Sequence, residues 1–196
     1  MKVLHCLRRF LNLGAVDKAA PHLLHVKENS YMKPLNIAIL TVSDTRDLAT
    51  DTSGQYLCDT LIAAGHTLAA REIVKDDIYQ LRAVVSKWIA SNDIQVVITT
   101  GGTGFSGRDS TPEALQPLFD KNIEGFGELF RHYSLLEIGT STLQSRALAG
   151  MANRTLVFCV PGSTGACKTA WTTILEPQLN SETKPCNFVN HVKTVA

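Results

Sequence analysis

The chain has 196 residues, enough for one domain with a sizeable core and too few to indicate two domains without a visible linker. Its 19 Lys and Arg balance 18 Asp and Glu, so the formal net charge of +1 provides no field that would attract nucleic acid or an anionic membrane. No apolar run approaches the roughly 20 residues that a membrane-spanning helix needs. We therefore expect a protein that binds neither nucleic acid nor membrane.

The five cysteines are scattered along the chain, at positions 6, 58, 159, 167 and 186. They form no C-x-x-C pair, and no histidine lies at a spacing suited to zinc. An odd number of scattered cysteines is typical of reduced thiols, so we expect a cytoplasmic protein.

The composition divides the chain into an extension and one domain. In residues 1–33, Arg8 and Arg9 interrupt the apolar segment that a secretory leader would leave uncharged, and an organelle-transit peptide is disfavoured by Asp17 and Glu28. This extension is either a poorly ordered terminus or the product of a start codon upstream of Met32. Residues 34–190 form the predicted domain, and residues 191–196 form a C-terminal tail.

The domain begins with alternating strands and helices. Asn36 to Ser43 is a nearly continuous apolar run, typical of a strand buried on both faces. After a polar turn, Thr52 or Ser53 caps a predicted helix that ends at Gly65. His66 to Val74 has the character of a second strand.

The same alternation continues through the middle of the chain. A helix from Ile78 to Trp88 precedes a third strand, Ile94 to Thr100, which runs into a glycine-rich loop. Thr111 and Pro112 begin the next helix, because Pro is favoured at the first helical position. Three such units predict an α/β three-layer sandwich, in which a mostly parallel sheet has helices on both faces. Ligands of such sheets bind at the carboxyl ends of the strands.

The last third of the domain predicts a long helix, a hairpin and a second loop. The helix spans Glu124 to Gly139, and its aromatic residues are interpreted as core. Residues 147–160 form the hairpin, followed by a small-residue loop, Pro161-Gly162-Ser163-Thr164, and a helix from Ala166 to Leu175. Asn187 to Val189 is a candidate for one more short strand. The apolar residues of the long helix are Phe126, Leu129, Phe130, Tyr133 and Leu136.

The glycine-rich loop is the first candidate for a functional site. It reads TTGGTGFSGRDSTPEAL from Thr99 to Leu115 and follows a strand directly. It lacks the Gly-Lys-Ser/Thr ending of a P-loop and the G-x-G-x-x-G spacing of a dinucleotide fold. The pattern indicates either an anion-binding loop, whose glycines let the backbone approach a phosphate, or a tight turn that needs glycine for its own conformation.

Charged residues around this loop add to its chemistry. Arg108 offers a cationic fork to a phosphate, and Asp109 is a candidate Mg²⁺ ligand or, alternatively, a capping partner of the following helix. Ser43 and Asp44 follow the first strand at the same edge of the sheet. Asp76 follows the second strand there, and either it or its neighbour Asp77 caps the next helix.

Several stretches taken together resemble the MoaB/MogA family of molybdenum cofactor biosynthesis, and the pattern is closest to its bacterial MoaB branch. These stretches are TTGGTG with RDSTPEAL, EGFGELFR, GTSTLQSRALAG and VPGST. The resemblance runs from about Leu35 to Phe188. It implies a MoaB/Mog-like molybdopterin-binding fold, a homotrimer or homohexamer, and other molybdenum cofactor biosynthesis proteins as partners.

The resemblance also implies a reaction. MogA-type members adenylylate molybdopterin, with ATP as co-substrate and Mg²⁺ as cofactor, and release pyrophosphate. Asp109 matches the acid of the family's Arg-Asp-x-Thr-Pro motif and is the expected catalytic residue, with Asp76 as a second acid for Mg²⁺ or substrate. Substrate and phosphate groups are expected at Ser43, Asp44, Thr100, Gly101, Gly102, Thr103, Gly104, Arg108, Pro161, Gly162 and Ser163.

One departure from the family pattern leaves an alternative open. The family's second loop is often Pro-Gly-x-Pro, and Thr164 stands where the last proline would be. This feature is MoaB-like. The alternative function is therefore a MoaB-type oligomer that binds molybdopterin or a nucleotide without turnover.

Overall fold

The computed structural model describes residues 32–195, which belong to one compact unit. The expectations about the N-terminal extension fall on residues 1–31, which lie outside the described residues. No helix in residues 32–195 is long and apolar enough to cross a membrane.

The unit is built on a six-stranded sheet with the order β2-β1-β3-β6-β5-β4. Four neighbouring strands are parallel, namely β2 (Thr67–Val74), β1 (Asn36–Val42), β3 (Val96–Thr100) and β6 (Thr155–Val160). The other two pair antiparallel, β5 (Leu148–Ala152) with β6 and the two-residue β4 (Lys121–Asn122) with β5.

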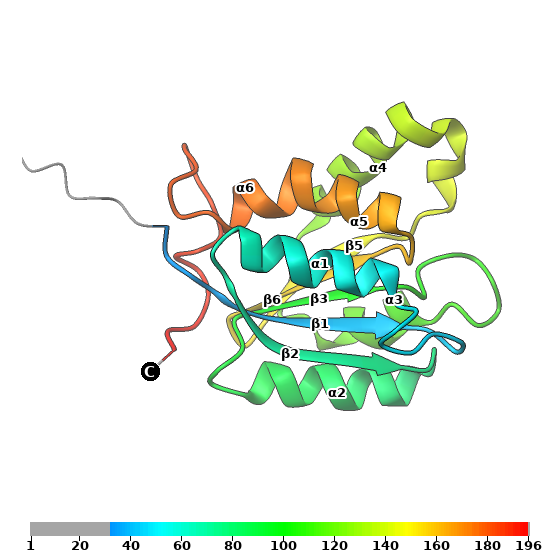
Figure 1. Ribbon diagram of the computed structural model, residues 1–196, viewed down its shortest axis with the longest axis horizontal. Helices are drawn as coiled ribbons and strands as arrows, with labels where there is room; N and C mark the ends of the chain where they lie inside the picture. Colours follow the sequence, from blue (N-terminus) through cyan, green and yellow to red (C-terminus); the bar gives the residue numbers. More distant parts are fainter. Residues whose placement is uncertain (1–31, 196) are drawn as a thin grey trace, which may run out of the picture. The chain divides into compact units, whose positions relative to one another are not determined.

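Helices cover both faces of this sheet, which confirms the expected three-layer α/β sandwich (Figure 1). One face carries α1, α4, α5 and α6, and the other carries α2 and α3. The helices are α1 (Thr52–Ala63), α2 (Ile78–Ala90), α3 (Thr111–Leu115), α4 (Glu124–Ile138), α5 (Thr164–Ala170) and α6 (Glu176–Leu179), with shorter helical turns η1 (Gln116–Leu118), η2 (Gly139–Gln144) and η3 (Trp171–Leu175).

Alternation along β1 explains why its sequence is almost continuously apolar. Ile37 and Ile39 pack into the core beneath α1 and α5, whereas Ala38 and Leu40 pack into the core beneath α2 and α3. All four side chains are fully buried. A strand that separates two cores has no face for polar residues.

The first helix begins one residue earlier than predicted. Asp51, and neither Thr52 nor Ser53, caps α1, because its Oδ1 accepts a hydrogen bond from the Gly54 N–H at 2.9 Å. Its Oδ2 accepts from Thr41 Oγ1 at 2.7 Å, so the cap also ties the helix to the carboxyl end of β1. The Asp51 carboxylate accepts hydrogen bonds from two elements at once, which a single hydroxyl at Thr52 or Ser53 would not do.

Asp51 stays ionised although it is almost fully buried. Burial on its own would raise the pKa of this carboxyl, but hydrogen bonds from Thr41 and Gly54 and the Arg71 guanidinium, 3.1 Å away, outweigh burial and hold the pKa below its usual value. The resulting cluster joins β1, β2 and α1 just behind the loops at the carboxyl edge of the sheet.

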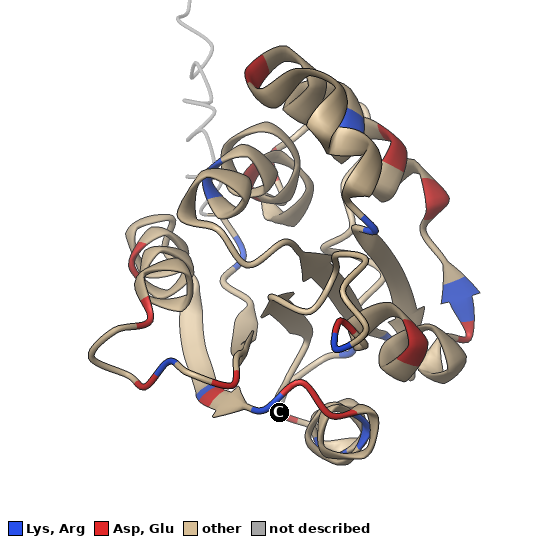
Figure 2. Ribbon diagram, turned by 90° about the vertical axis from the view of Figure 1, so that its right-hand side faces the viewer, with Lys and Arg blue, Asp and Glu red and all other residues tan. Residues whose placement is uncertain are grey.

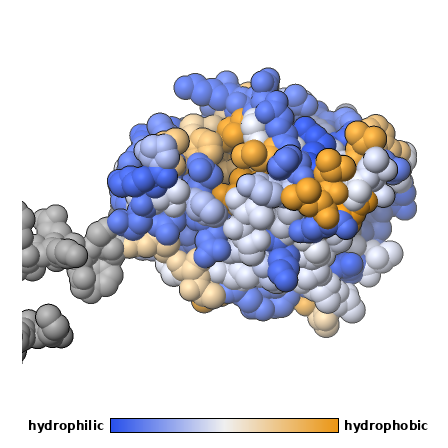
Figure 3. Space-filling view, turned by 90° about the horizontal axis from the view of Figure 1, so that it is seen from above, coloured by the Kyte–Doolittle hydropathy of each residue, from blue (hydrophilic) through white to orange (hydrophobic). Residues whose placement is uncertain are grey.

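Only part of the predicted apolar face of α4 is buried. Phe126 and Phe130 lie in the core, as predicted for the aromatic residues of this helix, whereas Leu129 and Leu136 are 49% and 75% exposed. The helix contacts the sheet along a narrow stripe and extends past it (Figure 1). Apolar patches are visible on this side of the molecule (Figure 3).

The predicted hairpin is confirmed, and the predicted final strand is not. Asn153 and Arg154 adopt φ values of 46° and 57°, which turn β5 into β6. Residues 187–189 form a bend that leads into a turn, without strand pairing. The chain beyond them packs along the amino ends of the strands, where Val192 is buried.

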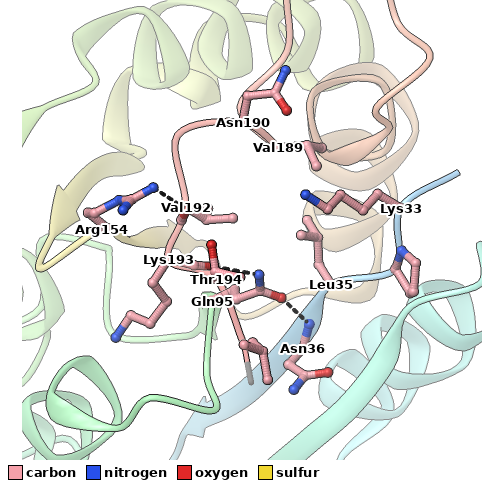
Figure 4. Close-up of a pocket in the computed structure, with 12 residues that line it drawn as sticks. Lys33, Leu35, Asn36, Gln95, Arg154, Val189, Asn190, Val192, Lys193 and Thr194 are labelled. Carbon is pink, nitrogen blue, oxygen red and sulfur yellow. Dashed lines mark hydrogen bonds between the residues drawn. The ribbon is translucent and has the colours of Figure 1, made fainter.

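The buried side chain of Gln95 is one of the groups that join this final segment to the sheet. Gln95 Oε1 accepts from the Asn36 N–H at 2.9 Å, and its Nε2 donates to the Lys193 carbonyl at 2.7 Å. These contacts border a cavity of about 210 Å³ (Figure 4). The cavity lies at the end of the parallel strands opposite the glycine-rich loop.

Candidate functional site

A cleft of about 480 Å³ lies at the carboxyl end of the central strands. One wall is the glycine-rich loop, the floor is the turn after β6, and the far wall is formed by α4 and η2. The residues that line it are Val42, Gly101, Gly102, Thr103, Gly104, Asp109, Phe130, Ser134, Ile138, Ser141, Gln144, Ser145, Pro161, Gly162, Ser163 and Ala166.

The loop needs glycine at the positions where it leaves β3. Gly101 has φ of +112°, and a Cβ there would overlap the carbonyl oxygen of Val42. Gly102 has φ of +64°, and a Cβ there would overlap the Thr111 hydroxyl. Both glycines therefore serve the tight turn, which was one of the two interpretations of the pattern.

The same turn leaves donors directed at no protein acceptor. The Gly101 N–H donates to the Val160 carbonyl at 3.0 Å, but within residues 32–195 the N–H groups of Gly102, Thr103 and Gly104 have no hydrogen-bond acceptor. All three residues line the cleft. Successive unpaired N–H groups on a concave surface attract an anion, so the tight turn is compatible with the anion interpretation, which stays a prediction.

Asp109 lines the same cleft, next to Gly104. Its Oδ2 accepts from the Ser106 N–H at 2.7 Å, and a Cβ on Gly104 would lie 2.9 Å from that oxygen. Ser110, at the cap position of α3, makes no side-chain capping bond. Asp109 therefore stabilises the turn of its own loop and is not a capping partner of α3.

The two acids after β2 have separate tasks. Asp77 caps α2, since its Oδ1 accepts from the Tyr79 and Gln80 N–H groups, both at 2.9 Å. Asp76 instead binds the end of the glycine loop: its Oδ1 accepts from Ser110 Oγ at 2.6 Å and from the Ser110 N–H at 3.1 Å. Asp76 is not part of the cleft lining, although its Oδ2 lies beside Gly102, which is.

Three other predicted residues also lie near the cleft without lining it. Ser43 Oγ accepts from the Thr45 and Arg46 N–H groups and so closes its own turn. Asp44 forms an ion pair with Arg108, with 2.6 Å between Oδ2 and Nη2. Figure 2, which views the carboxyl ends of the parallel strands, shows acidic and basic residues close together on these loops.

Thr100, the last residue of β3, connects the glycine-rich loop to the loop after β6. Its hydroxyl donates to the Pro161 carbonyl at 3.2 Å and lies 3.2 Å from Cys167 Sγ. Burial raises the pKa of the Cys167 thiol to about 11. The thiol is therefore protonated at neutral pH and unsuited to act as a nucleophile.

The far wall was not predicted from the sequence. Ser134, Ser141, Gln144 and Ser145 provide uncharged polar groups there, beside Phe130 and Ile138. The helical pattern of residues 124–139 indicates burial but does not show which buried face borders a cleft. The sequence feature that could have indicated this wall is the run of mostly small polar residues from Gly139 to Ser145, directly after the helix.

The cavity at the opposite end of the sheet is a poorer candidate for this chemistry. Its lining includes Lys33, Arg154 and Lys193. Arg154, however, donates to the Val192 carbonyl (Figure 4), and Lys193 Nζ donates to the Ile89 carbonyl, and both bonds hold the C-terminal segment. It lies at the amino ends of the strands, where parallel sheets do not usually bind ligands. None of the predicted site residues lines it.

The carboxylate groups near the cleft determine whether it could hold a metal ion. Within residues 32–195, no three His, Cys, Asp or Glu side chains are grouped so that they could hold a metal ion. Mg²⁺ commonly uses only one or two carboxylates together with substrate phosphates. Asp109, whose Oδ1 has no hydrogen-bond partner within residues 32–195, lines the cleft with the unpaired N–H groups and fits that pattern.

The chain is similar to known proteins over most of its length. A sequence profile for the family described as "Probable molybdopterin binding domain" matches residues 38–181. The chain is 59% identical over 160 residues to molybdenum cofactor biosynthesis protein B of Escherichia coli K12, covering 82% of this chain and 94% of that protein. It is 49% identical over 159 residues to the Staphylococcus aureus protein of the same name, covering 80% and 92%.

Solved structures show the same similarity. A crystal structure of a molybdenum cofactor biosynthesis protein B superposes with a TM-score of 0.73 at 47% identity, covering 75% of this chain and 92% of the other. The tungsten cofactor synthesizing protein MoaB from Pyrococcus furiosus superposes with a TM-score of 0.66 at 36% identity, covering 73% and 91%.

Proposed function

The chain belongs to the molybdenum cofactor biosynthesis family of molybdopterin-binding domains, and from this membership and the geometry of the cleft we propose that it transfers an adenylyl group from ATP to molybdopterin. The terminal phosphate oxygen of the pterin attacks the α-phosphorus of ATP. The bond from that phosphorus to the bridging oxygen of the β-phosphate breaks, and pyrophosphate leaves.

One observation carries the proposal. Asp109 and the unpaired N–H groups of residues 102–104 line the same cleft. Phosphoryl-type transfers need little covalent help from the protein, because positioning and stabilisation of developing negative charge supply most of the catalysis. The N–H groups would hold a phosphate, and the carboxylate would hold the magnesium ion that accompanies ATP.

Two carboxylates are available to Mg²⁺ at this loop. Asp109 has one oxygen without a protein partner inside the cleft. Asp76 Oδ2 is likewise unpaired within the described residues, and it lies beside Gly102, where a Cβ would come within 2.7 Å of it. When bound, Mg²⁺ would neutralise charge on the phosphates. We propose Asp109 as the principal ligand and Asp76 as the second.

The uncharged far wall suits the ring end of the substrate. Ser134, Ser141, Gln144 and Ser145 present hydroxyl and amide groups next to the apolar Phe130 and Ile138. A flat heteroaromatic system needs this combination of a face to pack against and edges that accept and donate hydrogen bonds. The pterin would lie there, with its phosphate toward the glycine loop.

The alternative is a protein that binds the pterin without turnover. It is favoured by the single carboxylate in the cleft lining and by Thr164 in the second loop. The deciding experiment incubates the purified protein with molybdopterin, ATP and Mg²⁺ and measures adenylylated pterin and pyrophosphate. Pterin binding without either product would reject the transferase and support the binding protein.

We also propose that the protein acts as a homotrimer or homohexamer. Large apolar side chains of α4 and η2 are exposed in the single chain, and such patches commonly mark protein interfaces. Light scattering of the purified protein would measure the mass, and a monomer would reject this part of the proposal. The exposed side chains are Leu129, Leu135, Leu136, Ile138 and Leu143.

A further inference from the structure

We propose that Arg146 is a positioning residue that holds the glycine loop, and with it Asp109, in the conformation that the transfer needs. This inference rests on the proposed function. Arg146 follows η2 and precedes β5, so it lies more than thirty positions along the chain from the loop that it contacts. It is not part of the cleft lining, and it acts through the residues that are.

Arg146 contacts both ends of the loop. Its main-chain N–H donates to the Thr103 carbonyl at 3.1 Å, and its Nε donates to the Gly104 carbonyl at 2.8 Å. Its Nη2 donates to the Asp109 carbonyl at 3.0 Å. Within residues 32–195, no other side chain donates to a main-chain carbonyl of residues 103–109. Arg146 therefore holds the loop at Thr103 and Gly104 and again at Asp109.

The remaining contacts fix the guanidinium itself. Nη1 forms an ion pair with Glu113 of α3, and the guanidinium lies over the Phe105 ring, 5.3 Å from its centroid. The Arg146 side chain is 22% exposed. Because its charge is already matched by Glu113 and its plane is covered by Phe105, this arginine is organised to hold the protein chain and not to clamp a ligand phosphate.

The chemistry of arginine is required for this task. A planar guanidinium donates in several fixed directions at once, and Arg146 uses three of its nitrogens for three acceptors on different parts of the loop and helix. A lysine keeps the positive charge but is a single donor centre that cannot span them. Arg146→Lys therefore tests geometry while charge is held constant.

Arg146 also connects the two walls of the cleft. Its neighbours Gln144 and Ser145 line the far wall, whereas Thr103, Gly104 and Asp109 line the near wall. The loop carries the N–H groups for the phosphate and the carboxylate for the metal, so a loosened loop would misplace both. A misplacement of about 1 Å can lower turnover by roughly 10²-fold.

The test compares Arg146→Lys with Arg131→Lys. Arg131 is a matched control because its Nη1 donates to the carbonyl of the adjacent Ala147, at 3.2 Å, but it has no bond to the loop. We expect Arg146→Lys to lower kcat about 10²-fold with little change in KM for the pterin, and Arg131→Lys to leave kcat near the wild-type value. Unchanged kcat in Arg146→Lys overturns the proposal.

Hydrogen exchange gives a readout that needs no turnover. In Arg146→Lys, the hydrogen-bonded amides of the peptide covering residues 101–111 should exchange roughly tenfold faster, about the effect of losing a hydrogen bond to a charged group. Amides elsewhere, and the whole of Arg131→Lys, should exchange at wild-type rates. Equal loop exchange in the two variants overturns the role of Arg146, whether or not the wild type adenylylates the pterin.

A second, milder variant keeps the test valid if Arg146→Lys misfolds. Glu113→Gln removes only the charged partner of Arg146 and leaves its bonds to the loop carbonyls. We expect a smaller increase in loop exchange and a smaller loss of kcat, both in the same direction. If Glu113→Gln and Arg146→Lys both retain wild-type exchange and kcat, the positioning role is rejected.

Discussion

Arg108 on the glycine loop pairs with Asp44 on the loop after β1, with 2.6 Å between Nη2 and Oδ2. The Arg108 side chain is 72% exposed and that of Asp44 is 26% exposed. Exposed ion pairs contribute at most about 1 kcal/mol and are screened by salt. The guanidinium can therefore leave Asp44 for a ligand phosphate at small cost.

The first prediction concerns this competition between Asp44 and the ligand. In Asp44→Asn, Arg108 loses its carboxylate partner, and we expect ATP to bind up to about fivefold more tightly at low salt, as about 1 kcal/mol implies. Arg108→Gln should weaken binding, and both effects should fade at high salt. Titration calorimetry measures the affinities. Weaker binding in Asp44→Asn would show that Asp44 itself contacts the ligand.

The second prediction concerns the left-handed turn at Gly101. In Gly101→Ala, the methyl group would overlap the Val42 carbonyl, and a φ of +112° is strained for any residue with a Cβ. We expect more than about 2 kcal/mol of lost unfolding free energy, measured by urea denaturation. Gly107→Ala is the control, because a Cβ there meets nothing within 4 Å. Equal stability of the two variants would contradict the role of Gly101.

The third prediction concerns the pH dependence of stability. His66 is buried, its Nδ1 accepts the Leu35 N–H at 3.2 Å, and burial lowers its pKa. The folded state thus keeps the ring neutral at a pH where the unfolded chain, with a pKa near 6.5, binds a proton. Stability from this group is complete above pH 6.5 and falls as the pH drops below it, by at most about 1.4 kcal/mol per pH unit.

His66→Asn isolates that effect, because its Oδ1 stands close to the position of Nδ1 and does not titrate. The difference in unfolding free energy between wild type and variant should stay constant above pH 6.5. From pH 6.5 to pH 5, the wild type should lose stability relative to the variant. The effect of titrating the carboxylates is the same in both proteins and cancels in this difference. A constant difference down to pH 5 would show that His66 is protonated equally in both states.

Much of the fold could be predicted because its signals are local. The apolar run of β1 reflects burial on both faces, and Pro112 at the start of α3 reflects the constraints of a first helical turn. The two-residue β4 was missed, since Lys121 and Asn122 are exposed and pair with β5 only through the backbone. No periodicity can indicate a strand of that length.

The candidate site was predictable only on one side. Gly101 to Gly104 and Asp109 carry a compact motif, whereas Arg146 reaches them from a distant segment and no spacing in the sequence links the two. Likewise, Asp76 and Asp77 are adjacent acids that the sequence cannot tell apart. The choice depends on Ser110, 34 positions away from Asp76 in the chain, which only the folded structure brings within hydrogen-bond distance.

The fourth prediction concerns the charge of Asp76. In Asp76→Asn, the amide oxygen can still accept from Ser110, so the loop should keep its conformation. We expect lower kcat and a higher Mg²⁺ requirement, with a smaller loss than for Asp109→Asn. Turnover measured against Mg²⁺ concentration checks this. If the variant shows the Mg²⁺ dependence of the wild type, Asp76 does not bind the metal and only holds Ser110.

The last prediction concerns Asp109, whose carboxylate separates a transferase from a binding protein. In Asp109→Asn, the side-chain oxygen can still accept from the Ser106 N–H, so the turn of the loop persists while the negative charge in the cleft is lost. We expect pterin affinity to stay near the wild-type value and turnover to fall roughly 10²-fold or more, the usual cost of losing one electrostatic group.

The control for Asp109→Asn is Asp77→Asn, the same chemical change at the same edge of the sheet. Asp77 caps α2 outside the cleft, and Asn is as good a cap as Asp, so this variant should keep wild-type turnover. Product formation and pterin affinity are measured for both variants. Since the loop conformation is preserved in Asp109→Asn, unchanged turnover there would mean that the carboxylate serves only the turn, and adenylyl transfer would then have to proceed without it.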